Sequence, residues 1–193
     1  MPMRSLLPHP RGLAAVVALF LAAAVAPAAH AQLAIEGRAG IATPSDALTN
    51  DVEADGGYST EVSLTVGVLP FVGVYGAWQQ VKFDREGSEE SVITDQGWTV
   101  GARASVPTPF IPIDPWIRAG LVVHELEAGG LEGGGDRGVG TEVGAGLRVS
   151  VGSRIALTPG VTWTRYGFDD DSVADGRVNV EYLRVDVGLR FGF

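Results

Sequence analysis

The sequence predicts an all-β protein, an eight-stranded antiparallel up-and-down transmembrane β-barrel. Three observations lead to this prediction. Apolar residues alternate with polar or small residues through eight segments, which is the two-residue period of a strand with two different faces. Long acidic connections alternate with shorter ones along the chain. Beyond residue 31, no apolar run reaches the roughly 20 residues of a membrane-spanning helix, so a membrane crossing would require strands.

The first 31 residues are predicted to be a cleaved secretory signal peptide and not part of the fold. Two arginines precede the apolar run of residues 12–26, and Ala29-His30-Ala31 is a small-residue cleavage site. The alternative is a transmembrane anchor, but the run is shorter than the roughly 20 residues that a span needs. We therefore expect the mature chain to start at Gln32 and to form one barrel domain over residues 32–193.

Composition narrows the classes of function. The chain has no Cys, which rules out a disulfide framework, and its formal charge is −9. An acidic chain argues against nucleic acid as a partner, because phosphate binding needs a basic face. No cofactor motif, metal-ligand cluster or catalytic constellation stands out, so we predict no cofactor, no metal centre and no enzymatic activity.

Seven of the eight predicted strands have two distinct faces. In Leu33–Ala42, Leu33 and Ile35 fall on one face, and Glu36 and Arg38 fall on the other. The same separation recurs in Tyr58–Val68, Val92–Val106 and residues 116–124, 138–149, 154–163 and 182–193. Each strand is expected to have about ten residues, which is enough for a tilted strand to cross an outer membrane.

The remaining strand, Phe71–Phe83, cannot be assigned an inner and an outer face. Its apolar residues fall on both faces of the alternation. A β-bulge near Gly73 or Gly76 would explain the pattern.

The connections differ in character according to which end of the barrel they would occupy. The long acidic ones are Thr43–Gly57, Asp84–Ser91, Glu127–Arg137 and Gly167–Arg177. The others are tight turns at Leu69-Pro70 and Gly152-Ser153, and the Pro-rich, largely apolar stretch Pro107–Pro115. Long loops at one end and short turns at the other are typical of outer-membrane barrels. A soluble lipocalin-like barrel also alternates but has no reason to sort its loops in this way.

The polar face is predicted to line a narrow lumen. It is rich in Gly, Ser and Thr, and it carries charges of both signs, whereas a water-exposed face would carry more Lys than the single Lys82. An eight-stranded barrel leaves room inside for little more than side chains, and buried charges must pair. The predicted lumen charge network is Glu36, Arg38, Glu61, Arg103, Arg118, Glu142, Arg148, Arg184 and Asp186. These charges either plug the lumen structurally or form an ion path or gate.

The last eight residues carry a resemblance to a known class of proteins. Asp186, Gly188, Phe191 and Phe193 match the C-terminal assembly signal of bacterial outer-membrane barrels position by position. With the strand pattern and the leader, the chain from residue 32 to 193 resembles the small eight-stranded outer-membrane barrels of the OmpA, OmpX and opacity-protein type. The resemblance implies a Gram-negative outer-membrane location, contact with lipid and lipopolysaccharide, and recognition by the barrel-assembly machinery.

Two other features suggest possible sites. The four long loops hold fifteen acidic and three basic residues, which suits either a solvated surface or the capture of divalent cations at the extracellular loops. His124 is the only histidine beyond the leader. A lipid-modifying enzyme would need a nucleophile within hydrogen-bond reach of it, but no Ser lies nearby in the sequence. We therefore interpret His124 as a lumen or rim residue.

The aromatic residues cluster toward the strand ends, which favours aromatic belts at the two membrane interfaces. The residues concerned are Tyr58, Trp78, Phe83, Trp98, Trp116, Trp163, Tyr166, Phe168, Phe191 and Phe193. The leading prediction is a non-enzymatic outer-membrane barrel with a structural, surface-interaction or adhesion-like role. The alternatives are a narrow pore for small solutes, a lipid-modifying enzyme and a soluble periplasmic lipid carrier.

Overall fold

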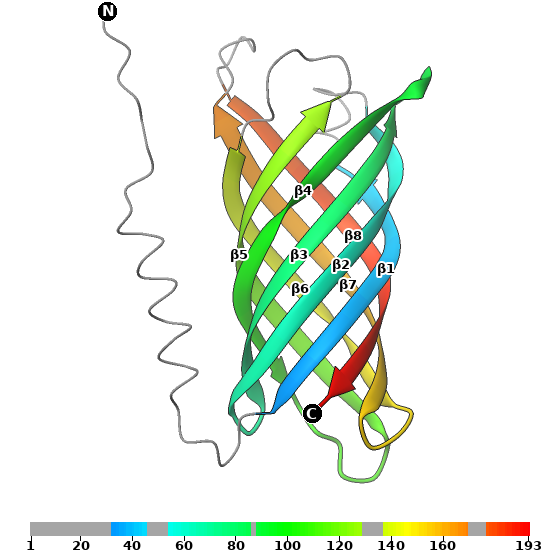
Figure 1. The fold of residues 1–193 in the computed structure, drawn as a ribbon, viewed down its shortest axis with the longest axis vertical. Coiled ribbons are helices and arrows are strands. Elements are labelled where there is room, and N and C mark those ends of the chain that lie inside the picture. The colour runs from blue at the N-terminus through cyan, green and yellow to red at the C-terminus, as the bar shows by residue number, and fades with distance from the viewer. Residues whose placement is uncertain (1–31, 46–53, 86–87, 129–136, 170–176) are drawn as a thin grey trace, which may run out of the picture.

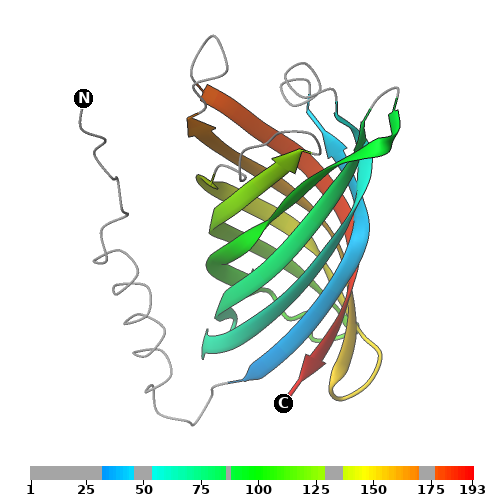
Figure 2. The same ribbon diagram turned by 45° about the horizontal axis from the view of Figure 1, so that its top comes forward.

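The computed structural model describes residues 32–45, 54–85, 88–128, 137–169 and 177–193. The strands in them are β1 (Leu33–Pro44), β2 (Ala54–Leu69), β3 (Val72–Arg85), β4 (Ser88–Ser105), β5 (Ile113–Ala128), β6 (Arg137–Ser150), β7 (Ile155–Asp169) and β8 (Arg177–Gly192). Each strand pairs with the next, and β8 pairs back to β1. The result is a closed barrel of tilted antiparallel strands (Figures 1 and 2), which confirms the predicted fold class.

The two ends of the barrel differ. At one end, β1 begins, β8 ends, and β2–β3, β4–β5 and β6–β7 are joined; we call it the turn end (Figure 1). The opposite end, the loop end, carries the other connections. The predicted signal peptide, residues 1–31, lies outside the described residues, and so do large parts of the four predicted acidic loops. In the part of the chain that the structure describes, no helix is long and apolar enough to cross a membrane.

The strands are longer than the ten residues predicted, ranging from 12 in β1 to 18 in β4. The prediction of a long loop over Asp84–Ser91 is wrong, because β3 continues to Arg85 and β4 already starts at Ser88. At the turn end, β5 starts at Ile113, so the predicted connection Pro107–Pro115 is shorter as well. The additional length lies beyond the segments of clear apolar alternation from which the strands were predicted.

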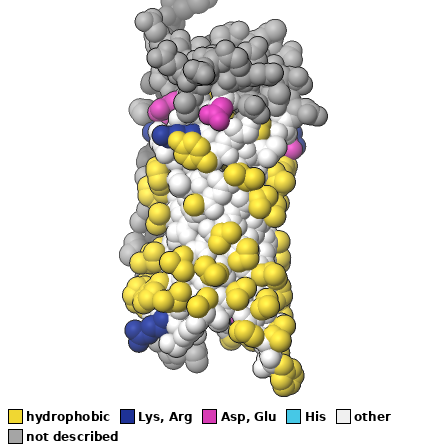
Figure 3. Space-filling view, turned by 90° about the vertical axis from the view of Figure 1, so that its right-hand side faces the viewer, with side chains coloured by type: hydrophobic (Ala, Val, Ile, Leu, Met, Phe, Trp, Pro, Cys, Tyr) yellow, Lys and Arg dark blue, Asp and Glu magenta, His cyan; other side chains and the backbone are white. Residues whose placement is uncertain are grey.

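The outer wall is apolar through most of its height. Leu183, Val185, Val187, Leu189 and Phe191 of β8 are all exposed on this wall. From Leu183 to Phe193 is about 33 Å along a strand, or roughly 25 Å along the axis at a tilt near 40°. That height matches the apolar band of outer-membrane barrels. In Figure 3, hydrophobic side chains are spread over the visible wall, and the visible charged side chains lie near its two ends.

Toward the loop end, the outward-facing residues become polar. Arg165 lies 3.9 Å from Glu181 across β7 and β8, and Arg137 lies 3.4 Å from Glu125 across β5 and β6. Lys82 continues this ring on β3. We call these five residues the polar collar. Its side chains suit contact with water and not with lipid tails.

β3, whose inner and outer faces could not be assigned from the sequence, extends from the apolar wall into the polar collar. Residues 73, 75, 77, 79, 81 and 83 of β3 are buried, and the residues between them face outward. A register shift does lie near Gly73, but it is on the partner strand, between Gly67 and Leu69 of β2. The pairing of β3 itself is continuous from Gly73 to Phe83, so a bulge does not explain why its apolar residues fall on both faces. Apolar residues occupy both faces of β3 because its turn-end part carries them on the outward face, whereas its loop-end part carries them on the inward face.

The predicted aromatic belts form only in part. Tyr58 and Trp98 are exposed on the outer wall, and Trp78 pairs directly with Trp98 across β3 and β4. Trp116 and Tyr166, in contrast, are almost completely buried inside the barrel, as is Phe83. A tendency to lie near strand ends therefore does not distinguish an interface aromatic from one that fills the lumen.

Candidate functional site

In the part of the barrel that the structure describes, buried side chains occupy much of the lumen, and the charged ones lie toward the turn end. Glu36 of β1 is the centre of the first cluster. Its Oε1 accepts hydrogen bonds from Arg38 Nη1 at 2.5 Å and Thr158 Oγ1 at 2.7 Å. Its Oε2 accepts from Arg103 Nη1 at 2.6 Å and Arg190 Nη1 at 3.2 Å. One buried carboxylate thus serves three guanidinium groups from three strands.

Arg38 extends this cluster across the junction where the barrel closes. Its Nε donates to Oδ1 of Asp186 at 2.9 Å, and its Nη2 contacts the same oxygen. Arg38 belongs to β1 and Asp186 to β8, so the ion pair joins the first strand to the last.

A second cluster lies one layer closer to the loop end. Arg118 donates from Nη1 and Nη2 to the two carboxylate oxygens of Glu61, at 2.7 and 2.8 Å. Arg184 Nη2 reaches the same Glu61 at 3.0 Å and lies 3.5 Å from Glu142. Tyr75 donates its hydroxyl to Glu142 at 2.6 Å. Two arginines and two glutamates therefore balance one another, as buried charges must to limit their desolvation cost.

Trp116 packs among the charges of the first cluster. The guanidinium carbons of Arg103 and Arg38 lie 4.3 and 5.0 Å from its ring centroid, within the range of a cation–π contact. Glycines leave room for the indole, because a Cβ at Gly160 would lie 2.5 Å, and one at Gly146 2.6 Å, from the same ring carbon. The glycine-rich polar face of the sequence thus accommodates a large aromatic side chain.

The loop-end part of the lumen has a different composition. His124 Nδ1 lies 3.0 Å from Asp95 Oδ1, and its ring meets Tyr166 edge-on with centroids 5.4 Å apart. Around and beyond this pair, the interior is a buried apolar cluster. Its members are Ala42, Val81, Phe83, Ile93, Val122, Leu126, Tyr166, Val180 and Tyr182. We call it the apolar plug.

Eight of the nine predicted lumen charges belong to the two clusters; the ninth, Arg148, lies at the turn end and pairs with Asp114 through its Nε at 2.9 Å. Three further charged side chains inside the barrel were not in the predicted network: Asp95, Asp114 and Arg190. His124, which was predicted to lie in the lumen or at its rim, is buried inside the barrel. The alternation already places Asp95 and Arg190 on the polar face, so a stricter application of it would have included them. Asp114 lies in a Pro-rich stretch that hides the start of β5.

Comparisons with known proteins show which fold this is. No protein-family model and no curated protein matches the chain. Among solved structures, Neisserial surface protein A aligns with a TM-score of 0.66 at 17% identity, covering 83% of this chain and 97% of that one. The N-terminal β-barrel domain of Pseudomonas aeruginosa OprF aligns with a TM-score of 0.55 at 14% identity over 85% and 100% of the two chains.

Ail, the attachment invasion locus protein of Yersinia pestis, aligns with a TM-score of 0.50 at 15% identity, over 84% of this chain and 99% of its own. The chain has the fold of the small eight-stranded outer-membrane β-barrels. At these identities the likeness concerns the fold, and the function must be argued from the chain's own residues.

The fold gives the C-terminal octet a definite place. Phe191 and Phe193 lie on the outer wall at the turn end, with ring centroids 5.1 Å apart, while Asp186 and Gly188 face the lumen. A Cβ at Gly188 would lie 2.8 Å from Glu36 Oε1, so the glycine of this octet also makes room for the first cluster. Recognition of these four residues by an assembly machinery stays a prediction.

The residues considered for catalysis and metal binding are differently placed. His124 is 1% exposed, so its imidazole is sealed inside the barrel. Within the described ranges, no three His, Asp or Glu side chains gather as a metal site. Much of the acidic loop set falls outside those ranges, and divalent-cation binding there stays a prediction.

Proposed function

We propose that this protein is a non-enzymatic outer-membrane barrel with a closed lumen, which serves a structural or surface-interaction role and not transport. The observation that carries the proposal is the filling of the lumen. Two ion-paired clusters occupy its turn-end part, and the apolar plug occupies its loop-end part. A path for ions would need mobile water beside the charges, whereas the charges of these clusters are buried and ion-paired and the side chains of the plug are buried and mostly apolar.

The outer surface supports the membrane location. The apolar wall has the height of an outer-membrane hydrocarbon layer, and the polar collar follows it directly toward the loop end. We place the turn end in the periplasm and the loop end outside the cell. Fractionation tests this placement: a band whose gel mobility shifts on heating should appear in the outer-membrane fraction, and a soluble periplasmic band would contradict it.

Conductance across a planar lipid bilayer tests the closed lumen. We expect no steady single-channel currents from the wild-type protein. Reconstituted protein that still shows the heat-dependent gel shift serves as the control, because it demonstrates that folded barrels are present. Steady, reproducible currents from such a preparation would reject a closed lumen and favour the narrow pore.

The surface-interaction role also draws support from the structural neighbours, one of which is named a surface protein and another an attachment protein. The competing enzymatic role depends on His124. Replacing His124 with Ala should leave the lipid A of producing cells unchanged, as measured by mass spectrometry. A modification present with wild type and lost with H124A would establish a lipid-modifying enzyme instead.

A further inference from the structure

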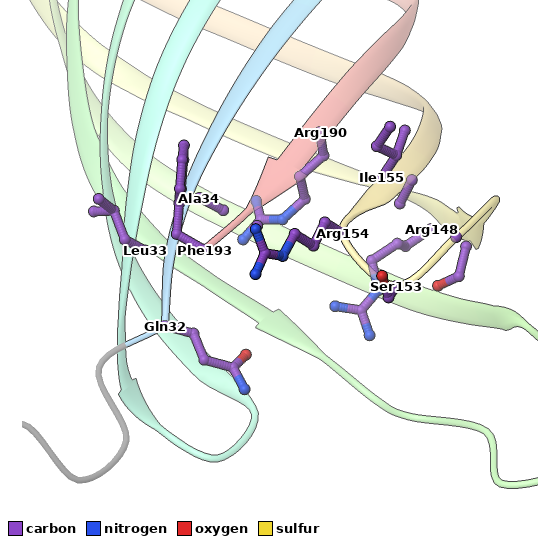
Figure 4. Close-up of a pocket in the computed structure, with 13 residues that line it drawn as sticks. Gln32, Leu33, Ala34, Arg148, Ser153, Arg154, Ile155, Arg190 and Phe193 are labelled. Atoms are coloured by element: carbon purple, nitrogen blue, oxygen red, sulfur yellow. The ribbon is translucent and has the colours of Figure 1, made fainter.

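A hollow at the turn end opens beneath the first charged cluster. Its volume is about 440 Å³, and polar side chains from several strands line it: Gln32, Thr65, Arg103, Ser105, Arg148 and Arg190. A neighbouring hollow of about 320 Å³ shares Gln32, Arg148 and Arg190 and adds Arg154. Figure 4 shows the neighbouring hollow, where Arg148, Arg154 and Arg190 project at the mouth of the barrel. The turn end therefore holds a basic vestibule inside an acidic protein.

The larger hollow has an uneven charge. Three arginines line it, and among its described lining residues there is no Asp or Glu. The nearest acids lie behind the arginines: Glu36 accepts from Arg103 and Arg190, and Asp114 accepts from Arg148. Each guanidinium has five N–H donors, and these contacts use only a few of them.

The first cluster also carries more positive than negative charge. Arg38, Arg103 and Arg190 share only Glu36 and Asp186, so one cation in this group has no carboxylate of its own. Arg103 is 6% exposed, and its Nη2 has no hydrogen-bond partner among the described residues. The arginines around the larger hollow therefore bring an excess of positive charge to it, which an anion bound there would balance.

We propose that this vestibule binds a phosphate group, either free or on a lipid headgroup. Guanidinium groups bind phosphate oxygens through paired, charge-assisted hydrogen bonds, and several guanidiniums arranged around one cavity suit a tetrahedral anion. Thr65 and Ser105 add hydroxyl donors at the same wall. Leu69 and Phe71, exposed at the rim, give the organic part of a headgroup an apolar surface to lie on.

Isothermal titration calorimetry on the folded barrel in a nonionic detergent tests the site. Two probes are used, inorganic phosphate and dihexanoyl-phosphatidylglycerol, each against sodium chloride at matched ionic strength. We expect saturable binding of a phosphate probe but not of chloride. Arg148→Gln and Arg103→Gln should each weaken it at least fivefold. Arg165→Gln, in the polar collar at the opposite end, is the matched control and should bind like wild type.

The two probes identify the source of the phosphate. Binding of both, or of inorganic phosphate alone, supports a site for the free anion, whereas binding of the lipid alone supports a headgroup site. Arg148 contacts neither cluster core, so R148Q decides the question even if R103Q fails to fold. Heats that chloride reproduces, or R148Q and R165Q binding equally well, would overturn the proposal.

Discussion

The two ends of this barrel distribute polar and apolar side chains in opposite ways between the outer wall and the lumen. In the turn-end part, the wall is apolar and the lumen holds Glu36, Arg103 and their partners. In the loop-end part, the collar is polar outside, and Val81 and Phe83 are buried inside. The first arrangement suits a strand surrounded by lipid, and the second is that of a water-soluble barrel. The level at which the polarity reverses therefore marks where we place the membrane boundary.

The neighbouring positions on β3 and β8 show the reversal most directly. Lys82 faces outward between the buried Val81 and Phe83, and Glu181 faces outward between the buried Val180 and Tyr182. In both strands, the apolar residues thus move from the outward to the inward face without any shift in register. At each level of the barrel, the lumen side chains are polar where the outer wall is apolar and apolar where the wall is polar.

The largest expected effect is on the charged part. Glu36→Gln removes the carboxylate that three arginines share, which leaves buried cations without a partner, and should lower the free energy of unfolding by about 3–5 kcal/mol. The measurement is denaturant unfolding of barrels reconstituted in lipid vesicles. Glu125→Gln, the same change at an exposed pair, should cost less than about 1 kcal/mol. Equal effects would mean that burial does not distinguish the two sites.

The apolar plug is tested by truncation. Phe83→Ala removes a buried ring that meets Tyr182 edge-on, with centroids 5.6 Å apart, and should cost about 3 kcal/mol through the cavity it leaves. Phe83→Leu, which keeps most of the volume, should cost about 1 kcal/mol in the same unfolding experiment. If F83A unfolded like wild type, the loop-end part would not contribute a packed core.

A smaller effect should come from the packing around Trp116. Gly160→Ala places a Cβ 2.5 Å from the indole and should destabilise the barrel by about 1–3 kcal/mol. Gly37→Ala is the control, because nothing lies within 4 Å of a Cβ there, and it should be nearly neutral. Thermal loss of the heat-modifiable band compares the two variants. Identical midpoints would show that Trp116 can move aside without cost.

For seven of the eight strands, the sequence was sufficient to predict which charged residues face inward, but not what they meet there. Period-two alternation determines the side of every residue once the strands are known, which is why the sequence alone could place Glu36, Glu61 and Arg184 in the lumen. It says nothing of partners, because Arg118 and Glu61 are 57 residues apart and meet only once the barrel closes. The pairing depends on strand stagger, which the sequence pattern does not encode.

The loop-end part was the less predictable one, and the reason is physical. If each strand met the same environment along its whole length, its apolar residues would all face outward, and on that basis the faces of Phe71–Phe83 could not be assigned. Val81 and Phe83 break that rule because their level of the barrel lies in the collar. A change in the outward residues, such as Trp78 followed by Gln80 and Lys82, is the signal that could have located the boundary.

The ion pair between Arg38 and Asp186 has a consequence for how the barrel is completed. β1 is made first and β8 last, so this contact spans 148 residues and cannot form until the chain is nearly finished. A slip of one residue between these strands would turn Asp186 toward lipid and Val187 inward. A slip of two would keep the faces but separate the charges. The register that buries Asp186 against Arg38 is therefore the one in which both charges are partnered, and a misaligned closure would lack this ion pair.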